Sequence, residues 1–90
     1  REHAERRKRK TPTKLSYKDQ RELDALPAEI ERLEADIAAM QETIASPDFY
    51  SQDTERVQAG LRELSAAEEE LERRIERWGE LENLKESFLD

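Results

Sequence analysis

Cysteine is absent from this sequence of 90 residues, and glycine, proline and aromatic residues are scarce. Without cysteine the chain can form neither a disulfide nor a thiolate metal site, which is the ordinary state of an intracellular protein. We therefore expect a cytoplasmic protein. With only two glycines and three prolines, the chain has few positions at which a helix is forced to turn or end. Long helices are the expected result.

Apolar residues are also few, because 34% of the sequence is hydrophobic and 43% is charged. A chain of this size and composition can bury a seam between helices but hardly a cavity that encloses a ligand. The sequence has no apolar run near the roughly 18 residues of a membrane span and no signal-peptide pattern. This composition disfavours an enzyme active site, a membrane protein and a secreted protein.

The net charge of −7 conceals a division between the two ends of the chain. Residues 1–21 contain nine Lys or Arg and three Asp or Glu, whereas residues 22–90 contain seven and twenty. The first segment should attract polyanions and the second should repel them. The sequence also begins at Arg1, without a Met and within a charged run, so we expect a domain cut from a longer polypeptide.

Residues 1–14 are expected to form a basic arm. The segment has no apolar periodicity and is interrupted at Pro12, so it should be flexible, or helical only in its first part, until it is bound. Its basic run consists of Arg6, Arg7, Lys8, Arg9 and Lys10. Such side chains neutralise phosphates without reading bases. We predict that the arm binds nucleic acid; the alternative is a solvated linker that only aids solubility.

A first long helix is expected to begin at Tyr17. Ser16 followed three positions later by Asp19 resembles a capping box. The apolar positions that follow alternate at spacings of three and four, which is typical of a coiled-coil seam. They are Leu23, Leu26, Ile30, Leu33, Ile37, Met40 and Ile44. Pro27 lies inside this pattern and predicts a kink or a short break in the helix, because proline has no amide donor and crowds the preceding turn.

A second helix is expected after a short turn. Ser46, Pro47 and Asp48 should end the first helix, and Asp53 is placed to cap the next one. The seam positions of the second helix are Val57, Leu61, Leu64, Leu71, Ile75 and Trp78. The spacing therefore predicts a second amphipathic helix that can face the first.

The two seams match each other when the chain folds back on itself. Residues whose numbers add to about 101 then face one another, as Ile44 and Val57 do, and only the layer around Leu33 lacks an apolar partner. The sequence thus predicts an all-α fold in which residues 15–90 form a two-helix antiparallel coiled-coil hairpin. We expect a monomer, because the seams satisfy each other within one chain.

Several segments resemble a known family. Residues 14–23 (KLSYKDQREL) and 26–31 (LPAEIE) are similar to the start of the C-terminal domain of Uup-type ABC-F ATPases, and residues 47–50 (PDFY) and 77–82 (RWGELE) are similar to its tip and second helix. The resemblance implies an ATPase with two tandem nucleotide-binding domains, to which this chain is appended as a tail. In Uup-type members that tail is a DNA-binding coiled coil, and the broader ABC-F class acts on ribosomes.

The cofactors that the resemblance implies, ATP and Mg²⁺, belong to the upstream domains, because the chain has no Walker A glycine loop. The chain also lacks a nucleophile with an adjacent base, so we do not expect it to be an enzyme by itself. The coiled-coil tail of valyl-tRNA synthetase has a similar loop and heptad pattern. An RNA-binding or ribosome-binding coiled coil, or one that only binds protein, therefore stays open as the alternative to DNA binding.

The candidate nucleic-acid-binding residues continue from the arm onto the first helix. Lys14, Lys18 and Arg21 are about one turn apart and can extend the positive surface of the arm. Two aromatic side chains can stack on unpaired bases. Tyr17 lies at the start of the first helix, while Trp78 falls on the predicted seam, where core packing is favoured.

A second basic cluster consists of Arg73, Arg74 and Arg77. It can either join the arm as one positive end or pair with neighbouring glutamates, and we favour the pairing. His3 has no second ligand near it in the sequence, so no metal site is expected.

Overall fold

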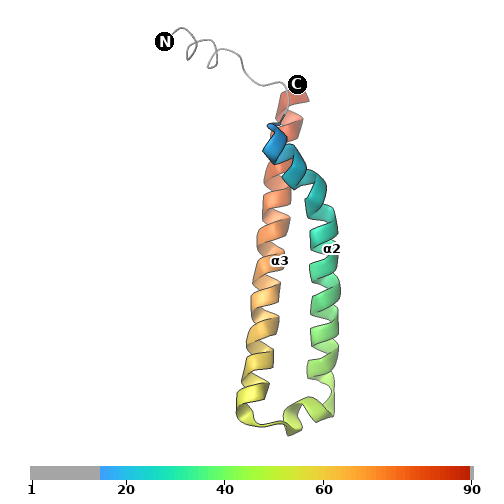
Figure 1. Ribbon diagram of the computed structural model, residues 1–90, viewed down its shortest axis with the longest axis vertical. Coiled ribbons are helices and arrows are strands. Elements are labelled where there is room, and N and C mark those ends of the chain that lie inside the picture. The colour runs from blue at the N-terminus through green and yellow to red at the C-terminus, as the bar shows by residue number, and fades with distance from the viewer. Residues whose placement is uncertain (1–14, 90) are drawn as a thin grey trace.

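The structure is a computed structural model that describes residues 15–89. The arm expected for residues 1–14 lies outside the described residues. The chain forms helix α2 (Tyr17–Ala45), the short 3₁₀ helix η1 (Pro47–Ser51) and helix α3 (Thr54–Leu89). Figure 1 shows α2 and α3 running side by side in opposite directions, with η1 in the turn between them. The predicted all-α antiparallel hairpin is confirmed.

The start of α2 is fixed by a cap and by a small core. The Ser16 side-chain oxygen accepts a hydrogen bond from the Asp19 backbone amide at 3.1 Å, as the capping pattern predicts. A buried cluster holds this end of the hairpin together. It consists of Leu15, Leu23, Leu26 and Leu81. Since three of these side chains come from the start of α2 and its cap and one from α3, the cluster closes the end of the hairpin that is opposite the turn.

Pro27 bends α2 without interrupting it. The helix is continuous from Tyr17 to Ala45, with Pro27 inside. Proline has no amide hydrogen, so the Leu23 carbonyl loses its helical partner and the helix can open on that side. Figure 1 shows the axis of α2 changing direction in its first third, so that its start lies across α3. Of the two forms that the sequence predicted, the kink is observed and the break is not.

The turn ends one helix and caps the next, as the sequence predicts. The Ser46 amide donates to the Thr43 carbonyl at 3.2 Å, and α2 stops at the residue before. The Asp53 carboxylate accepts a hydrogen bond from the Arg56 amide at 2.9 Å, which satisfies a free donor at the start of α3. The end of α2 is therefore closed by a local backbone hydrogen bond and the start of α3 by a local side-chain cap.

Phe49 folds back from η1 onto α3, and a glycine makes room for its ring. The ring is buried, whereas the neighbouring Tyr50 is exposed. A Cβ atom on Gly60 would lie 2.7 Å from Cε1 of Phe49, closer than carbon atoms approach one another. Gly79, on the same helix, has nothing within 4 Å of the corresponding position. The two glycines of the chain therefore differ in what they do.

This difference predicts opposite results for one substitution at two positions. We expect Gly79→Ala to raise the free energy of unfolding by about 0.5–1 kcal/mol, because alanine is the better helix former. Gly60→Ala should instead lower the melting temperature, because its methyl group displaces the Phe49 ring and this cost outweighs the better helix propensity of alanine. Thermal unfolding followed by circular dichroism measures both. An equal gain at the two positions would show that the ring moves aside freely.

The predicted seam is confirmed on α2 and wrong in part on α3. All seven seam positions of α2 are buried or half-buried. On α3, the predicted seam residues Leu61, Ile75 and Trp78 are instead exposed, at 42%, 45% and 38%. Arg74 and Arg77 are half-buried in place of the last two. Leu64 and Leu71 stay half-buried, so the seam is not lost along the whole of α3. At Ile75 and Trp78 it is displaced because Arg74 and Arg77 turn toward carboxylates of α2.

Candidate nucleic-acid interface

Three of the described candidates for nucleic-acid binding, Tyr17, Lys18 and Arg21, lie together in the first turns of α2. Lys18 and Arg21 are exposed, and Tyr17 is 77% exposed. The Arg21 guanidinium lies 5.6 Å from the centre of the Tyr17 ring, a cation–π contact across one helical turn. An exposed ring beside a guanidinium can stack on a base while the cation contacts a phosphate. The remaining candidates, Arg6, Arg7, Lys8, Arg9, Lys10 and Lys14, lie outside the described residues.

Arg77 belongs to an ion-pair network that joins α3 to the start of α2. Its guanidinium donates two hydrogen bonds to Glu22, at 2.9 Å and 3.1 Å, and lies 3.5 Å from a carboxylate oxygen of Asp19. A third carboxylate, that of Glu80 on α3 itself, is 3.3 Å away. The hydrogen bonds from Arg77 lower the pKa of the Glu22 carboxyl below its ordinary value of 4.5. The positive charge of Arg77 is thus neutralised within the hairpin.

Arg73 and Arg74 are paired in the same way. Both donate to the Glu70 carboxylate, at 2.8 Å and 2.7 Å, and Arg74 also reaches Glu29 on α2. Hydrogen bonds from Arg73 and then Arg74 lower the pKa of Glu70. The favoured interpretation, in which these arginines pair with glutamates, is confirmed. The spacing of three and four residues from Glu70 is the sequence signal for it.

We expect the network around Arg77 to make hairpin stability depend on pH. Because the pKa of Glu22 is lowered in the folded state, its contribution is present above about 4.5, the ordinary value, and is lost as the pH falls. Arg77→Gln should therefore lower the melting temperature by a few degrees at neutral pH and by less near pH 3. The measurement is thermal unfolding of both proteins at the two pH values.

Arg62→Gln is the matched control, because within the described chain Arg62 forms no ion pair. It should leave the melting temperature nearly unchanged at both pH values. A loss at Arg77 that is equally large in acid would mean that the side chain stabilises by packing and not by its ion pairs.

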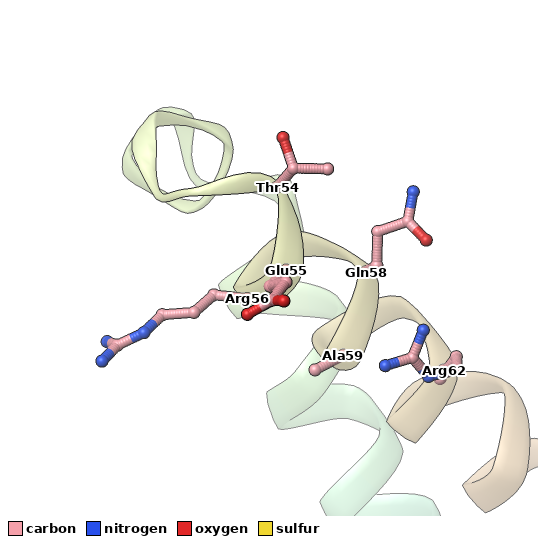
Figure 2. A pocket seen from close by; sticks show the side chains of 6 residues that line it. All are labelled: Thr54, Glu55, Arg56, Gln58, Ala59 and Arg62. Atoms are coloured by element: carbon pink, nitrogen blue, oxygen red, sulfur yellow. The ribbon is translucent and has the colours of Figure 1, made fainter.

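Two further arginines, at the turn, were not singled out by the sequence pattern. Arg56 and Arg62 line a shallow hollow of about 650 Å³ at the start of α3. The other residues around it are Thr54, Glu55, Gln58 and Ala59. Figure 2 shows the two guanidinium groups pointing in different directions. They do not converge on one anion, so the hollow is a weaker candidate than the start of α2.

Neither a metal centre nor a membrane span is found among residues 15–89. These residues contain no group of three or more His, Cys, Asp or Glu side chains placed to hold a metal ion. No helix in the described part of the chain is long and apolar enough to cross a membrane.

The fold and the site define an antiparallel coiled-coil domain with two exposed basic side chains, Lys18 and Arg21, in the first turns of α2, at the end opposite the turn. The sequence pattern of one family, the ABC transporter C-terminal domain, matches residues 14–83. The chain belongs to this family. Matches to Uup proteins confirm the predicted resemblance to the C-terminal domain of this type of protein.

Similar proteins are ATP-binding proteins of known sequence. The chain is 50% identical over 77 residues to the ATP-binding protein Uup of Escherichia coli (strain K12), a match that covers 86% of this chain and 12% of that protein. It is 47% identical over 72 residues to the ATP-binding protein Uup of Haemophilus influenzae, covering 80% of this chain and 11% of that protein. The chain thus spans only a small part of the length of these relatives.

A solved structure extends the likeness to three dimensions. It is described by the words "The C-terminal domain of the Uup protein is a DNA-binding coiled coil motif", and it matches with a TM-score of 0.77 at 48% sequence identity. The match covers 88% of this chain and 92% of that one. The two domains therefore correspond over almost their whole length.

Proposed function

We propose that this chain is the DNA-binding C-terminal coiled coil of an ABC-F type ATPase and that it binds DNA by phosphate contacts at its basic end. One observation carries the proposal. Lys18 and Arg21, at the start of α2, are exposed and make no ion pair within the described chain, whereas Arg77 on α3 is surrounded by carboxylates. The DNA-binding coiled coil of Uup, which this chain resembles, supports it.

The charge distribution restricts how a polyanion can approach. Residues 22–90 carry thirteen more acidic than basic side chains, so phosphates should be repelled along most of the hairpin. At physiological salt this repulsion is screened beyond about 8 Å. DNA that contacts the basic end can therefore remain attached while the rest of the hairpin extends away from it.

We assign most phosphate contacts to the arm, residues 1–14, which precedes the coiled-coil domain of residues 15–90. The basic run of residues 6–10 supplies them, and Lys14, Lys18 and Arg21 extend the positive surface along α2. The exposed Tyr17 ring is available to stack on an unpaired base. None of these contacts requires a particular base sequence.

The whole protein is proposed to be a cytoplasmic ATPase. Its ATP and Mg²⁺ would be bound by nucleotide-binding domains upstream of this chain, and the coiled coil would have no catalytic activity itself. The ATP-binding relatives, of which the chain covers about 12%, support this division. The role of the coiled coil is then to hold the ATPase on nucleic acid.

The proposal is tested by titrating the chain against duplex, branched and single-stranded DNA and an RNA hairpin, each at two salt concentrations. We expect binding to DNA that weakens steeply as salt rises. Binding to the RNA hairpin alone would favour the ribosome or RNA alternative. If no nucleic acid is bound at either salt concentration, the chain is a coiled coil that binds protein.

A further inference from the structure

An apolar groove runs along the outside of the hairpin near the bend in α2. Its volume is about 310 Å³, and its residues are Pro27, Ile30, Glu31, Glu34, Ile75 and Trp78. Ile75 and Trp78 are two of the three large side chains that the heptad pattern places in the seam of α3 and the structure leaves exposed. Exposed apolar side chains that are gathered in one place are typical of a binding surface.

The ion pairs of α3 explain why this groove exists. Arg74 and Arg77 turn toward α2, where they meet Glu29 and Glu22. Residues one position further along the helix are rotated by about 100°, so Ile75 and Trp78 face outward when the arginines face α2. The groove is thus a fixed product of the hairpin packing.

Two carboxylates stand beside the apolar walls. Glu31 and Glu34 line the groove, and neither forms an ion pair within the described chain. A ligand that fits must therefore offer an apolar surface and a positive charge close together. An arginine side chain has both, because its aliphatic stem can lie on Ile30 and Ile75 while its guanidinium stacks on Trp78 and binds a carboxylate.

The charge of the groove argues against two other occupants. A second copy packed groove to groove would bring Glu31 and Glu34 against the same carboxylates, and DNA would bring phosphates against them, so both would be repelled. We propose that the groove binds an arginine-bearing basic segment of a protein partner. This proposal does not depend on DNA binding, since the groove shares no residue with the start of α2.

Trp78 provides a direct test, because it is the only tryptophan of the chain. The probe is a short amidated peptide of alternating leucine and arginine. We expect a saturable change in Trp78 fluorescence as this peptide is added. A peptide with lysine in place of arginine should bind more weakly, because an ammonium group neither stacks nor forms a bidentate pair. A peptide with glutamate in its place should not bind.

Two double variants separate the groove from general charge attraction. Glu31→Gln with Glu34→Gln should weaken peptide binding about tenfold, since the variant removes both carboxylates that can pair with the arginine of the peptide. Asp36→Asn with Glu42→Gln removes the same charge from exposed positions of α2 outside the groove. This control should bind within about twofold of the parent chain, and both variants should keep the parent's circular dichroism.

Several results would overturn the proposal. An unchanged Trp78 signal would show that the groove is not occupied, and an equal loss in both double variants would show that the peptide follows net charge alone. A fluorescence change that appears on concentrating the chain without peptide would make a second copy the occupant. A change produced by duplex DNA would assign the groove to nucleic acid.

Discussion

Alanine at residues 7–10 is expected to abolish most DNA binding while leaving the helix content and the melting temperature unchanged. The four residues replaced are Arg7, Lys8, Arg9 and Lys10. If the parent chain contacts about five phosphates, the logarithm of its binding constant should fall with that of the salt concentration at a slope near −4.5. Raising salt from about 50 to about 200 mM would then weaken binding several hundredfold.

The variant loses up to four of these contacts and keeps Arg6, Lys14, Lys18 and Arg21, so its slope should be clearly shallower than that of the parent, down to about −0.9 if a single contact remains. Fluorescence anisotropy with labelled duplex DNA measures both constants. Replacing Arg56 and Arg62 with alanine is the control, because these exposed arginines lie at the opposite end of the hairpin. Their loss should change the affinity little.

Undiminished affinity in the variant of residues 7–10 would mean that the arm is only a linker. The chain would then be a coiled coil that only binds protein, or it would bind DNA at a site around Arg73, Arg74 and Arg77. The latter site would require the ion pairs of α3 to open when DNA binds.

Leu81→Ala is expected to destabilise the hairpin severely. Leu81 is 0% exposed and is the member of the buried cluster that α3 contributes, packed with Leu15, Leu23 and Leu26. Removing a buried leucine side chain to alanine costs about 2–5 kcal/mol, a large fraction of the stability of a small domain. For a domain of this size, each kcal/mol lowers the melting temperature by about 4–8 °C. A fall of about 10 °C or more is therefore expected.

Leu61→Ala is the matched control on the same helix. The heptad pattern places Leu61 in the seam, but its side chain is well exposed in the structure. The substitution should therefore cost less than about 1 kcal/mol, with a correspondingly small fall in melting temperature. Thermal unfolding by circular dichroism compares the two variants. If the two variants lost equal stability, Leu61 would be as buried as the heptad pattern predicts, and the exposure of Leu61 in the structure would be contradicted.

Some features of this fold depend only on residues near one another in the sequence, and others depend on contacts between α2 and α3. The cap at Ser16, the stop at Ser46 and the cap at Asp53 depend on residues within one turn of the chain, so the sequence pattern locates them correctly. By contrast, the residues of α3 that face α2 depend on which side chains of α2 lie opposite them. Arg74 and Arg77 occupy it because glutamates lie opposite them, and a heptad pattern that counts only apolar residues cannot register that.

The turn and the candidate site also combine features that the sequence predicts with features that only the packing determines. An aromatic residue after Pro47 suggests a ring that folds back, but only the packing shows that Gly60 receives Phe49. Lys18 and Arg21 precede the first seam residue, Leu23, and both are exposed, while their role in binding stays a prediction. The sequence pattern does not predict the groove, because it places the apolar groove residues Ile30, Ile75 and Trp78 in the seam between the helices.

The buried leucine cluster also affects how the hairpin opens. A two-helix hairpin would ordinarily fray from the end opposite its turn, but here that end is held by the best-buried side chains of the fold. Leu33, near the middle of α2, is only half-buried, so local opening of the helix pair should begin near the middle of the hairpin, and amide exchange there should be faster than around the cluster. The first turns of α2 then stay rigid. Lys18 and Arg21 would lose little backbone entropy when a phosphate binds, because the cluster has already ordered the helix that carries them.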